Sequence, residues 1–238
     1  YIDPMFHSRI IGAKSANLDL HFFSENTLRY LLTKNGEGCD MSVIEGAMGY
    51  YDGAGLTSWK TSAHEIALVT ETPVVLVVNA RGAALSVLAV IEGFLRFRPE
   101  SGIRGVILNQ CTAMTYVSLS AAIEERFGIR CFGFLPKMDE CALESRHLGL
   151  VTAAEIQNLR EKMQALAAQA EKTLDIDSLL ALGHEAPPLR YAPIVLPRKE
   201  KIRLAVARDK AFCFYYEDSL DAVREMGGEI VPFSPLAG

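Results

Sequence analysis

The sequence predicts an α/β protein with a mostly parallel sheet and helices on both of its faces, followed by the first β–α–β unit of a second α/β domain. Two observations support this fold class. Short apolar runs bounded by Gly, Pro or Asn alternate with longer helix-like segments, as buried parallel strands alternate with crossover helices. The composition then changes at a proline-rich, basic stretch, and the alternation starts again after it.

In chain order, four apolar runs are predicted as buried strands and five longer segments as helices. The strands are residues 41–46, 73–79, 103–109 and 129–136, and the helices are residues 24–34, 61–71, 82–97, 116–127 and 152–173. The last helix opens with Thr152 and Glu155, which are spaced as in a capping box.

The composition change predicts the domain boundaries. Residues 174–201 include APPLRYAPIVLPRKEK, with four prolines and a basic cluster, and are predicted as a linker. Residues 1–173 would form the first domain. Residues 202–238 would begin the second, with a strand over 202–209, a helix over 216–227 and a second strand in GEIVPFSPL.

The bulk properties exclude several classes of partner. A net charge of −5 over 238 residues gives no electrostatic reason to expect nucleic acid or an anionic membrane as a partner. No apolar run approaches the length of about 18 residues that a membrane-spanning helix needs. The five cysteines are scattered and contain no CxxC pair, which favours reduced thiols in a cytoplasmic protein.

The segment VIEGAMGYYDG (Val43–Gly53) contains the strongest candidate site. It places Glu45 and Asp52 seven residues apart in a glycine-rich turn after an apolar run. Carboxylates supply the hard oxygen that Mg²⁺ prefers, and glycines let the backbone approach a ligand closely. A plain strand-to-helix connection explains the same residues equally well.

Three other polar clusters are weaker candidates. Pro4 fixes an extended approach that could present Asp3 to a site, although a solvated turn is the simpler explanation. Asn109 ends a predicted strand, where a side-chain amide could bind a purine or cap the next turn. Arg146 and His147 follow another strand, and such a pair is more often structural than functional.

Five segments, in order along nearly the whole chain, together resemble the cobyrinic acid a,c-diamide synthase family. They are YIDPMFH (1–7), VIEGAMGYYDG (43–53), GVILN (105–109), RHLGL (146–150) and ARDKAFCFYYEDSLD (207–221). The resemblance implies a P-loop NTPase domain of the dethiobiotin-synthetase type, followed by a triad-type glutamine amidotransferase domain. It also implies ATP, glutamine and a tetrapyrrole acid as substrates, with Mg²⁺, in cobalamin biosynthesis.

The resemblance assigns roles to the candidate residues. Glu45 would bind Mg²⁺, and Asp52 would bind Mg²⁺ or steer the substrate carboxylate. Tyr1 and Asp3 would line the substrate side, with Asp3 and Asp52 as the catalytic carboxylates. Asn109 would recognise the adenine. Arg146 and His147 would shape the nucleotide or substrate pocket.

The resemblance also implies an internal fragment. The chain contains no G-x-x-x-x-G-K-[ST] phosphate loop, which the family has upstream of its YIDP-like motif together with the first strand. The glutaminase nucleophile would lie beyond Gly238. Such a fragment should be inactive alone, and an unpaired sheet edge would favour a homo-oligomer.

Alternatives remain within and outside the family. The substrate could be hydrogenobyrinic acid or a nickel tetrapyrrole, and cobyric acid synthase is a relative that amidates other positions. Outside the family, the alternatives are a partitioning-type ATPase and a degenerate, non-catalytic nucleotide-binding module. The start of a glutaminase at 207–221 argues against the ATPase.

Overall fold

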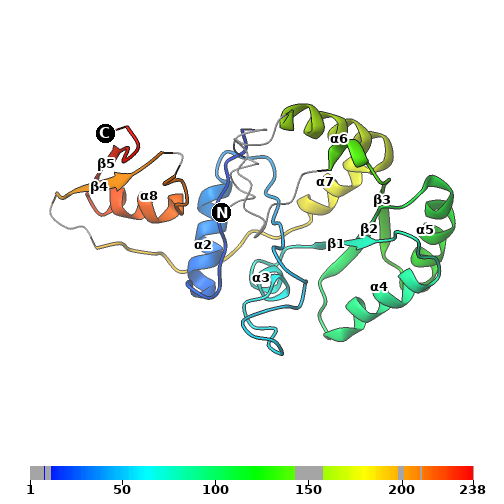
Figure 1. The fold of residues 1–238 in the computed structure, drawn as a ribbon. Helices are drawn as coiled ribbons and strands as arrows, with labels where there is room; N and C mark the ends of the chain where they lie inside the picture. Colours follow the sequence, from blue (N-terminus) through cyan, green and yellow to red (C-terminus); the bar gives the residue numbers. More distant parts are fainter. Residues whose placement is uncertain (1–7, 9–11, 143–157, 198–200, 210, 238) are drawn as a thin grey trace.

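The computed structural model describes residues 8, 12–142, 158–197, 201–209 and 211–237. The described elements form two separate sheets with helices around them (Figure 1). The helices are α2 (Glu25–Gly36), α3 (Ala63–Val69), α4 (Ser86–Phe97), α5 (Ala113–Phe127), the short 3₁₀ helix η1 (Asp139–Cys141), α6 (Leu159–Thr173), α7 (Ile176–His184) and α8 (Glu217–Glu225). The strands are β1 (Val74–Asn79), β2 (Ile103–Asn109), β3 (Arg130–Leu135), β4 (Arg203–Ala207) and β5 (Glu229–Phe233).

The first sheet has three parallel strands in the order β1-β2-β3. Helix α4 connects β1 to β2, and α5 connects β2 to β3, because parallel neighbours need a crossover. The register places Asn79 opposite Asn109, and Asn109 opposite Leu135. The carboxyl ends of the three strands therefore meet at one edge of the sheet.

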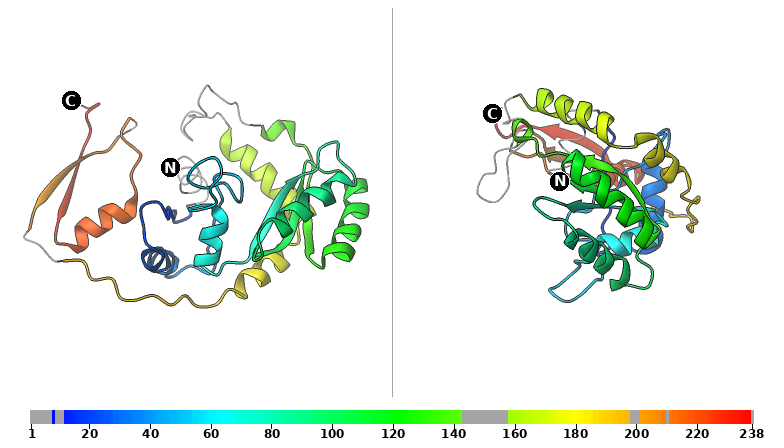
Figure 2. Two further views of the ribbon diagram at one scale, coloured as in Figure 1. Left: turned by 90° about the horizontal axis from the view of Figure 1, so that it is seen from below. Right: turned by 90° about the vertical axis from the view of Figure 1, so that its right-hand side faces the viewer.

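The main core lies between this sheet and helices α4 and α5. Its buried side chains come from the facing sides of these elements, and they include Val87, Ile91, Val106, Leu108, Leu119 and Ile123. Figures 1 and 2 show α4 and α5 on one side of the sheet and α6 and α7 on the other. The predicted α/β class, a parallel sheet covered by helices on both sides, is confirmed.

Strand β1 is buried on one face only. Leu76 and Val78 are buried, whereas Val77 between them is 61% exposed. Helices α6 and α7 contact β3, at the other edge of the sheet. The prediction that 73–79 is a strand is confirmed, but its burial alternates.

Helices α6 and α7 are attached to β3 at their junction. Gly133 pairs with Leu174 in an isolated antiparallel bridge, and the Asp175 N–H donates to the Phe132 carbonyl at 2.8 Å. Gly133 has a φ of +123°, and a Cβ at this position would overlap with the Thr173 carbonyl. Only glycine allows this close approach of two backbones.

The second sheet consists of β4 and β5, which run parallel, with α8 as the connection between them. Leu204 and Ala205 of β4 lie opposite Ile230 and Val231 of β5. Leu220 of α8 is the buried contact of that helix. The β–α–β unit predicted after residue 202 is therefore present.

One predicted strand is wrong. Residues 41–46 form no strand, and Val43 within them is 89% exposed. An apolar run becomes a strand only where a neighbouring edge supplies hydrogen-bond partners, and within the described part of the chain no strand pairs with this run.

Two predicted boundaries differ from those of the structure. Helix α6 begins at Leu159, because Asn158 has a left-handed φ of 55°, and the predicted capping box at Thr152 and Glu155 lies outside the described residues. Helix α7 lies within the predicted linker of residues 174–201 and contacts β3. The packed structure therefore continues to His184, and the extended stretch begins after it.

Candidate functional site

The glycine-rich segment Val43–Gly53 forms an exposed loop before α3. The N–H of Asp52 donates to the Gly49 carbonyl at 2.9 Å, which closes a turn. The exposed Asp52 carboxylate folds back over Gly49, where a Cβ would overlap with it. Glu45 lies earlier on the same loop and is also exposed. Both predicted metal-binding carboxylates can therefore be reached by a ligand.

Two tyrosines fix the turn that carries Asp52. The Tyr50 hydroxyl donates to the Ser101 carbonyl at 2.5 Å, and the Tyr51 hydroxyl donates to the Phe94 carbonyl at 2.6 Å. Burial raises the pKa of both phenols above their usual value, so the hydroxyls stay protonated and keep donating. The turn is thereby tied to the end of α4 and to the loop that follows it.

His64 connects the same turn to the start of α3. Its backbone N–H donates to the Tyr50 carbonyl at 3.0 Å, and its Nε2 lies 2.7 Å from the Glu100 carbonyl oxygen. The side chain is 2% exposed and contacts the rings of Tyr50, Tyr51 and Trp59. The aromatic cluster of Tyr50, Tyr51, Trp59 and the buried His64 thus holds the turn that carries Asp52.

This cluster contains two polar atoms without partners. Among the described residues, His64 Nδ1 and Arg98 Nε are buried and have no hydrogen-bond partner. The Arg98 guanidinium lies 4.1 Å from the centre of the Trp59 ring, so a cation–π contact compensates part of its burial.

Asn109 lies at the carboxyl edge of the first sheet, as predicted. Its side-chain oxygen accepts from the Gln110 N–H at 3.0 Å, and its backbone carbonyl accepts from the Ala80 N–H at 2.8 Å. Gln110 has a φ of 54°, and its Oε1 is buried without a partner among the described residues. The Oδ1 atom of Asn109 therefore caps the turn. The NH₂ group of the same side chain is a hydrogen-bond donor, and such a group can donate to a ring nitrogen.

The structure describes only part of the predicted site. Tyr1, Asp3, Arg146 and His147 lie outside the described residues. Glu45 and Asp52 share one loop, whereas Asn109 belongs to the end of β2. In the described part of the chain, no group of three His, Cys, Asp or Glu side chains could hold a metal ion by itself. The roles assigned to these residues therefore remain predictions.

Sequence reasoning gave no role to Tyr50, Tyr51, His64 or Gln110. Tyr50 and Tyr51 were visible as neighbours of Asp52, and a tyrosine pair beside a candidate carboxylate is a usable signal. No sequence pattern indicates that His64, Arg98 and the loop after α4 contribute to the site, because only folding brings them together.

The described helices and the cysteines have two further properties. No described helix combines the length and the apolar character needed to cross a membrane. All five cysteines are free thiols, and burial raises the pKa of Cys111 and Cys131.

Three relatives that bear the same name align with nearly the whole of this chain. The chain is 41% identical over 237 residues to the cobyrinate a,c-diamide synthase of Caldanaerobacter subterraneus, and 41% identical over 240 residues to that of Listeria monocytogenes. It is 40% identical over 243 residues to the cobyrinate a,c-diamide synthase of Gloeobacter violaceus. No protein-family model and no solved structure matches the chain.

These alignments cover 99% or 100% of this chain but 52% or 53% of each relative. The chain spans about half the length of the curated relatives it matches. Over its whole length, it is thus similar to the corresponding part of cobyrinate a,c-diamide synthases, which confirms the family resemblance predicted from its five motifs.

Proposed function

We propose that this chain is the ATP- and substrate-binding part, with the start of the glutaminase part, of an amidoligase that acts on cobyrinic acid. The a- and c-acetate carboxylates would be converted to amides, with glutamine as the nitrogen donor. The observation that supports this most is the alignment of the whole chain, at 40–41% identity, with proteins named cobyrinate a,c-diamide synthase.

The proposed reaction has two steps. A substrate carboxylate oxygen attacks the γ-phosphorus of ATP, the bond to the bridging oxygen breaks, and ADP leaves with an acyl phosphate remaining on the substrate. Ammonia then attacks the acyl carbon, the carbon–oxygen bond to phosphate breaks, and inorganic phosphate leaves with the loss of a proton from nitrogen. Phosphorylation is needed because a free carboxylate is a poor electrophile.

The carboxylates of the Val43–Gly53 loop suit magnesium. Mg²⁺ keeps several waters and takes one or two protein carboxylates together with phosphate oxygens, so the lack of a third described ligand is compatible with it. Glu45 and Asp52 are exposed hard-oxygen donors that would hold the ion. When bound, the ion supplies charge neutralisation to the phosphates.

The other roles follow from position and chemistry. The contacts of Tyr50, Tyr51 and His64 would keep Asp52 in position to bind Mg²⁺ or to steer the substrate carboxylate. Asn109, at the carboxyl edge of the sheet, would donate to the adenine. Tyr1 and Asp3 would bind the tetrapyrrole, and Arg146 and His147 would line the nucleotide or substrate pocket. Free thiols fit a cytoplasmic enzyme.

We assign the two sheets to two domains. The β1–β3 sheet with α2 to α7 would be the synthetase domain, and β4–α8–β5 would begin the glutaminase domain. The second sheet has two strands and leaves Leu204 and Phe233 40% and 50% exposed, which is expected of a sheet that further chain covers.

The test is Glu45→Gln in the complete gene product, assayed with cobyrinic acid, ATP, Mg²⁺ and glutamine. We expect ATP-dependent amidation to fall by at least about a hundredfold, since a neutral amide is a poor ligand for a hard cation, while glutamine hydrolysis continues. Glu171→Gln, an exposed glutamate of α6, is the matched control and should leave both rates unchanged.

Several outcomes would contradict the proposal. Full amidation by the Glu45→Gln variant would remove Glu45 from the metal site. Absence of amidation in the unmutated protein would overturn the proposed activity. Hydrogenobyrinic acid and a nickel tetrapyrrole are run as parallel substrates, and a clear preference for either would replace cobyrinic acid as the assigned substrate.

A further inference from the structure

Helix α2 contacts both parts of the chain. On the side facing the first part, Leu28 and Leu31 are 0% and 7% exposed, and the Arg29 Nε donates to the Val69 carbonyl at the end of α3 at 2.7 Å. Helix α2 therefore belongs structurally to the part of the molecule that holds the candidate site.

The opposite side of α2 carries Asn26, Tyr30 and Lys34, which are spaced four residues apart and so form one stripe along the helix. The first two hold the extended stretch after α7. Asn26 donates to the Ala192 carbonyl at 3.1 Å and accepts from the Ala192 N–H at 2.6 Å. The Tyr30 and Tyr191 rings lie 5.7 Å apart, edge to face. The stripe thus binds the segment that leads to the second sheet.

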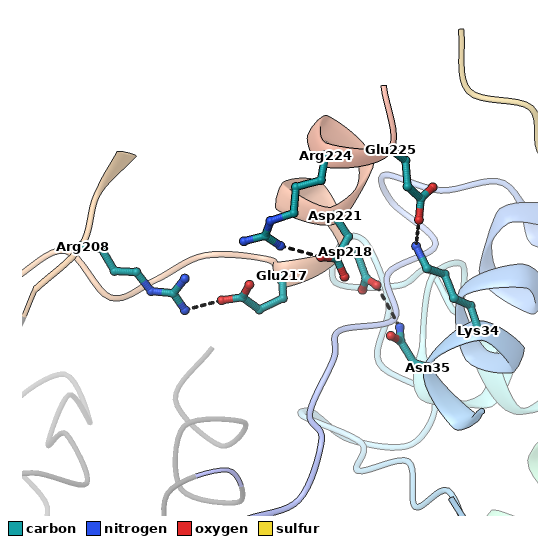
Figure 3. A network of polar contacts seen from close by, with 8 residues as sticks. All are labelled: Lys34, Asn35, Arg208, Glu217, Asp218, Asp221, Arg224 and Glu225. Carbon is teal, nitrogen blue, oxygen red and sulfur yellow. Dashed lines mark hydrogen bonds and ion pairs between the residues drawn. The ribbon is translucent and has the colours of Figure 1, made fainter. Parts of the chain in front are cut away.

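The end of the stripe contacts α8 of the second sheet unit. The Lys34 ammonium lies 2.6 Å from the Glu225 carboxylate, and the neighbouring Asn35 amide donates to the Asp218 carboxylate at 2.9 Å (Figure 3). The hydrogen bond to Glu225 is the main reason that the pKa of Lys34 is raised. Two adjacent residues of α2 therefore contact both ends of α8.

The charges of α8 are arranged for this contact. The helix has four acidic residues, and two of them pair within their own unit: Glu217 with Arg208 and Asp221 with Arg224. Asp218 and Glu225 are the two that α2 contacts. Figure 3 shows these contacts as four side-chain pairs, two of them within the β4–α8–β5 unit and two between α8 and α2.

We propose that α2 is the docking element that holds the β4–α8–β5 unit in register with the candidate site, and that this contact is needed for glutamine-dependent but not for ammonia-dependent amidation. This inference rests on the proposed function, because it assigns β4–α8–β5 to the glutaminase. Ammonia released at one domain must reach an acyl phosphate in the other, so the rate with glutamine depends on how the domains are aligned. Ammonia supplied from solution needs no such alignment.

The strength of the contact suits alignment rather than permanent attachment. An exposed ion pair changes an equilibrium by about twofold to fivefold. Reversal of the Lys34 charge has a larger effect, because it places a carboxylate beside Glu225 and Asp221, and like charges at an interface are costly.

The test is Lys34→Glu in the complete gene product, with amidation measured once with glutamine and once with ammonium chloride. We expect the glutamine-dependent rate to fall by at least about fivefold and the ammonia-dependent rate to stay within about twofold. The charge swap Lys34→Glu with Glu225→Lys should restore the glutamine-dependent rate. Lys172→Glu is the matched control, since Lys172 also lies in the last turn of its helix, α6.

The outcomes separate the two proposals. Equal losses with both nitrogen donors that the charge swap does not restore would overturn the docking role, and so would unchanged rates. If the unmutated protein forms no amide with either nitrogen donor, the proposed function is wrong, and so is the proposed role of α2 in glutamine-dependent amidation. A loss confined to glutamine and restored by the swap supports the inference.

Discussion

At the scale of single residues, the position of Asp52 depends on its neighbours more than on its own side chain. Tyr50 and Tyr51 hold the turn from one side and His64 holds it from the other, while the carboxylate lies over Gly49. A change at Gly49 can therefore move the carboxylate without disturbing the aromatic cluster, because the atoms that a Cβ would meet belong to the Asp52 side chain.

The substitution Gly49→Ala should displace the Asp52 carboxylate. A misplacement of about 1 Å can cost up to a hundredfold in rate, so we expect kcat/KM of the complete gene product to fall by about tenfold to a hundredfold. Thermal unfolding followed by circular dichroism should change little. An unchanged kcat/KM would show that the position of Asp52 does not matter for the reaction.

Gly93→Ala in α4 is the control for this change. A Cβ at Gly93 would meet no atom within 4 Å, and the site is inside a helix, so alanine should stabilise the protein by about 0.5–1 kcal/mol. Activity should not change. The comparison separates a displaced carboxylate from a general effect of replacing a glycine.

Among single residues, the sequence indicates the candidate site residues but not the side chains that pack around them. The VIEGAMGYYDG segment indicates carboxylates in a glycine-rich loop, and Asn109 is expected at the end of a strand. The contact of His64 with the Glu100 carbonyl and the placement of Arg98 over Trp59 depend on tertiary packing, which leaves no local pattern. Tyr1, Asp3, Arg146 and His147 remain predictions.

At the scale of elements, prediction succeeded where the apolar run is long and paired. Residues 103–109 form β2 with the predicted bounds, because this central strand has a neighbour on each side. The strand predicted at residues 41–46 is absent, because an apolar run alone does not supply a neighbouring strand to pair with. Helix α7 was not predicted, because the prolines that follow it dominate the composition of residues 174–201.

The junction of β3 and α7 should be sensitive to acid. The Asp175 carboxylate caps α7 by accepting from the Ser178 N–H and hydroxyl at 3.1 and 2.8 Å, and it pairs with Arg130 at 2.7 Å. These hydrogen bonds, and then the charge of Arg130, lower the pKa of Asp175. A lowered pKa contributes stability that is present above the ordinary value and is lost as the pH falls through the lower one.

The variant Asp175→Asn should therefore be less stable than the unmutated chain at pH 7, with a melting temperature lower by a few degrees. The difference should shrink as the pH falls below about 4, where the unmutated carboxylate becomes protonated. Asp177→Asn, which removes another acid from the first turn of α7, is the control for the loss of a negative charge at this helix end. A difference that stays constant from pH 7 to pH 3 would contradict the assigned pKa shift.

At the scale of the whole molecule, the two sheets are joined by α2 and by the extended stretch that runs along it. The contacts at Asn26, Tyr30 and Lys34 explain how a chain with a long proline-rich connection still holds its second sheet unit against the first part. The sequence predicted two units and a connection between them. It did not predict that a helix near the start of the chain would align them, since residues 34 and 225 are related only through the fold.

If the gene product activates a tetrapyrrole carboxylate with ATP before amidation, one oxygen of that carboxylate must leave with the phosphate, and a heavy oxygen isotope makes this transfer measurable. Cobyrinic acid labelled in its a- and c-acetate carboxylates is converted with ATP and glutamine, and the released inorganic phosphate is analysed by mass spectrometry. An acyl phosphate predicts that each amide formed transfers one labelled oxygen to phosphate. Amide formation with unlabelled phosphate, or phosphate release without any amide, would rule out an acyl phosphate intermediate.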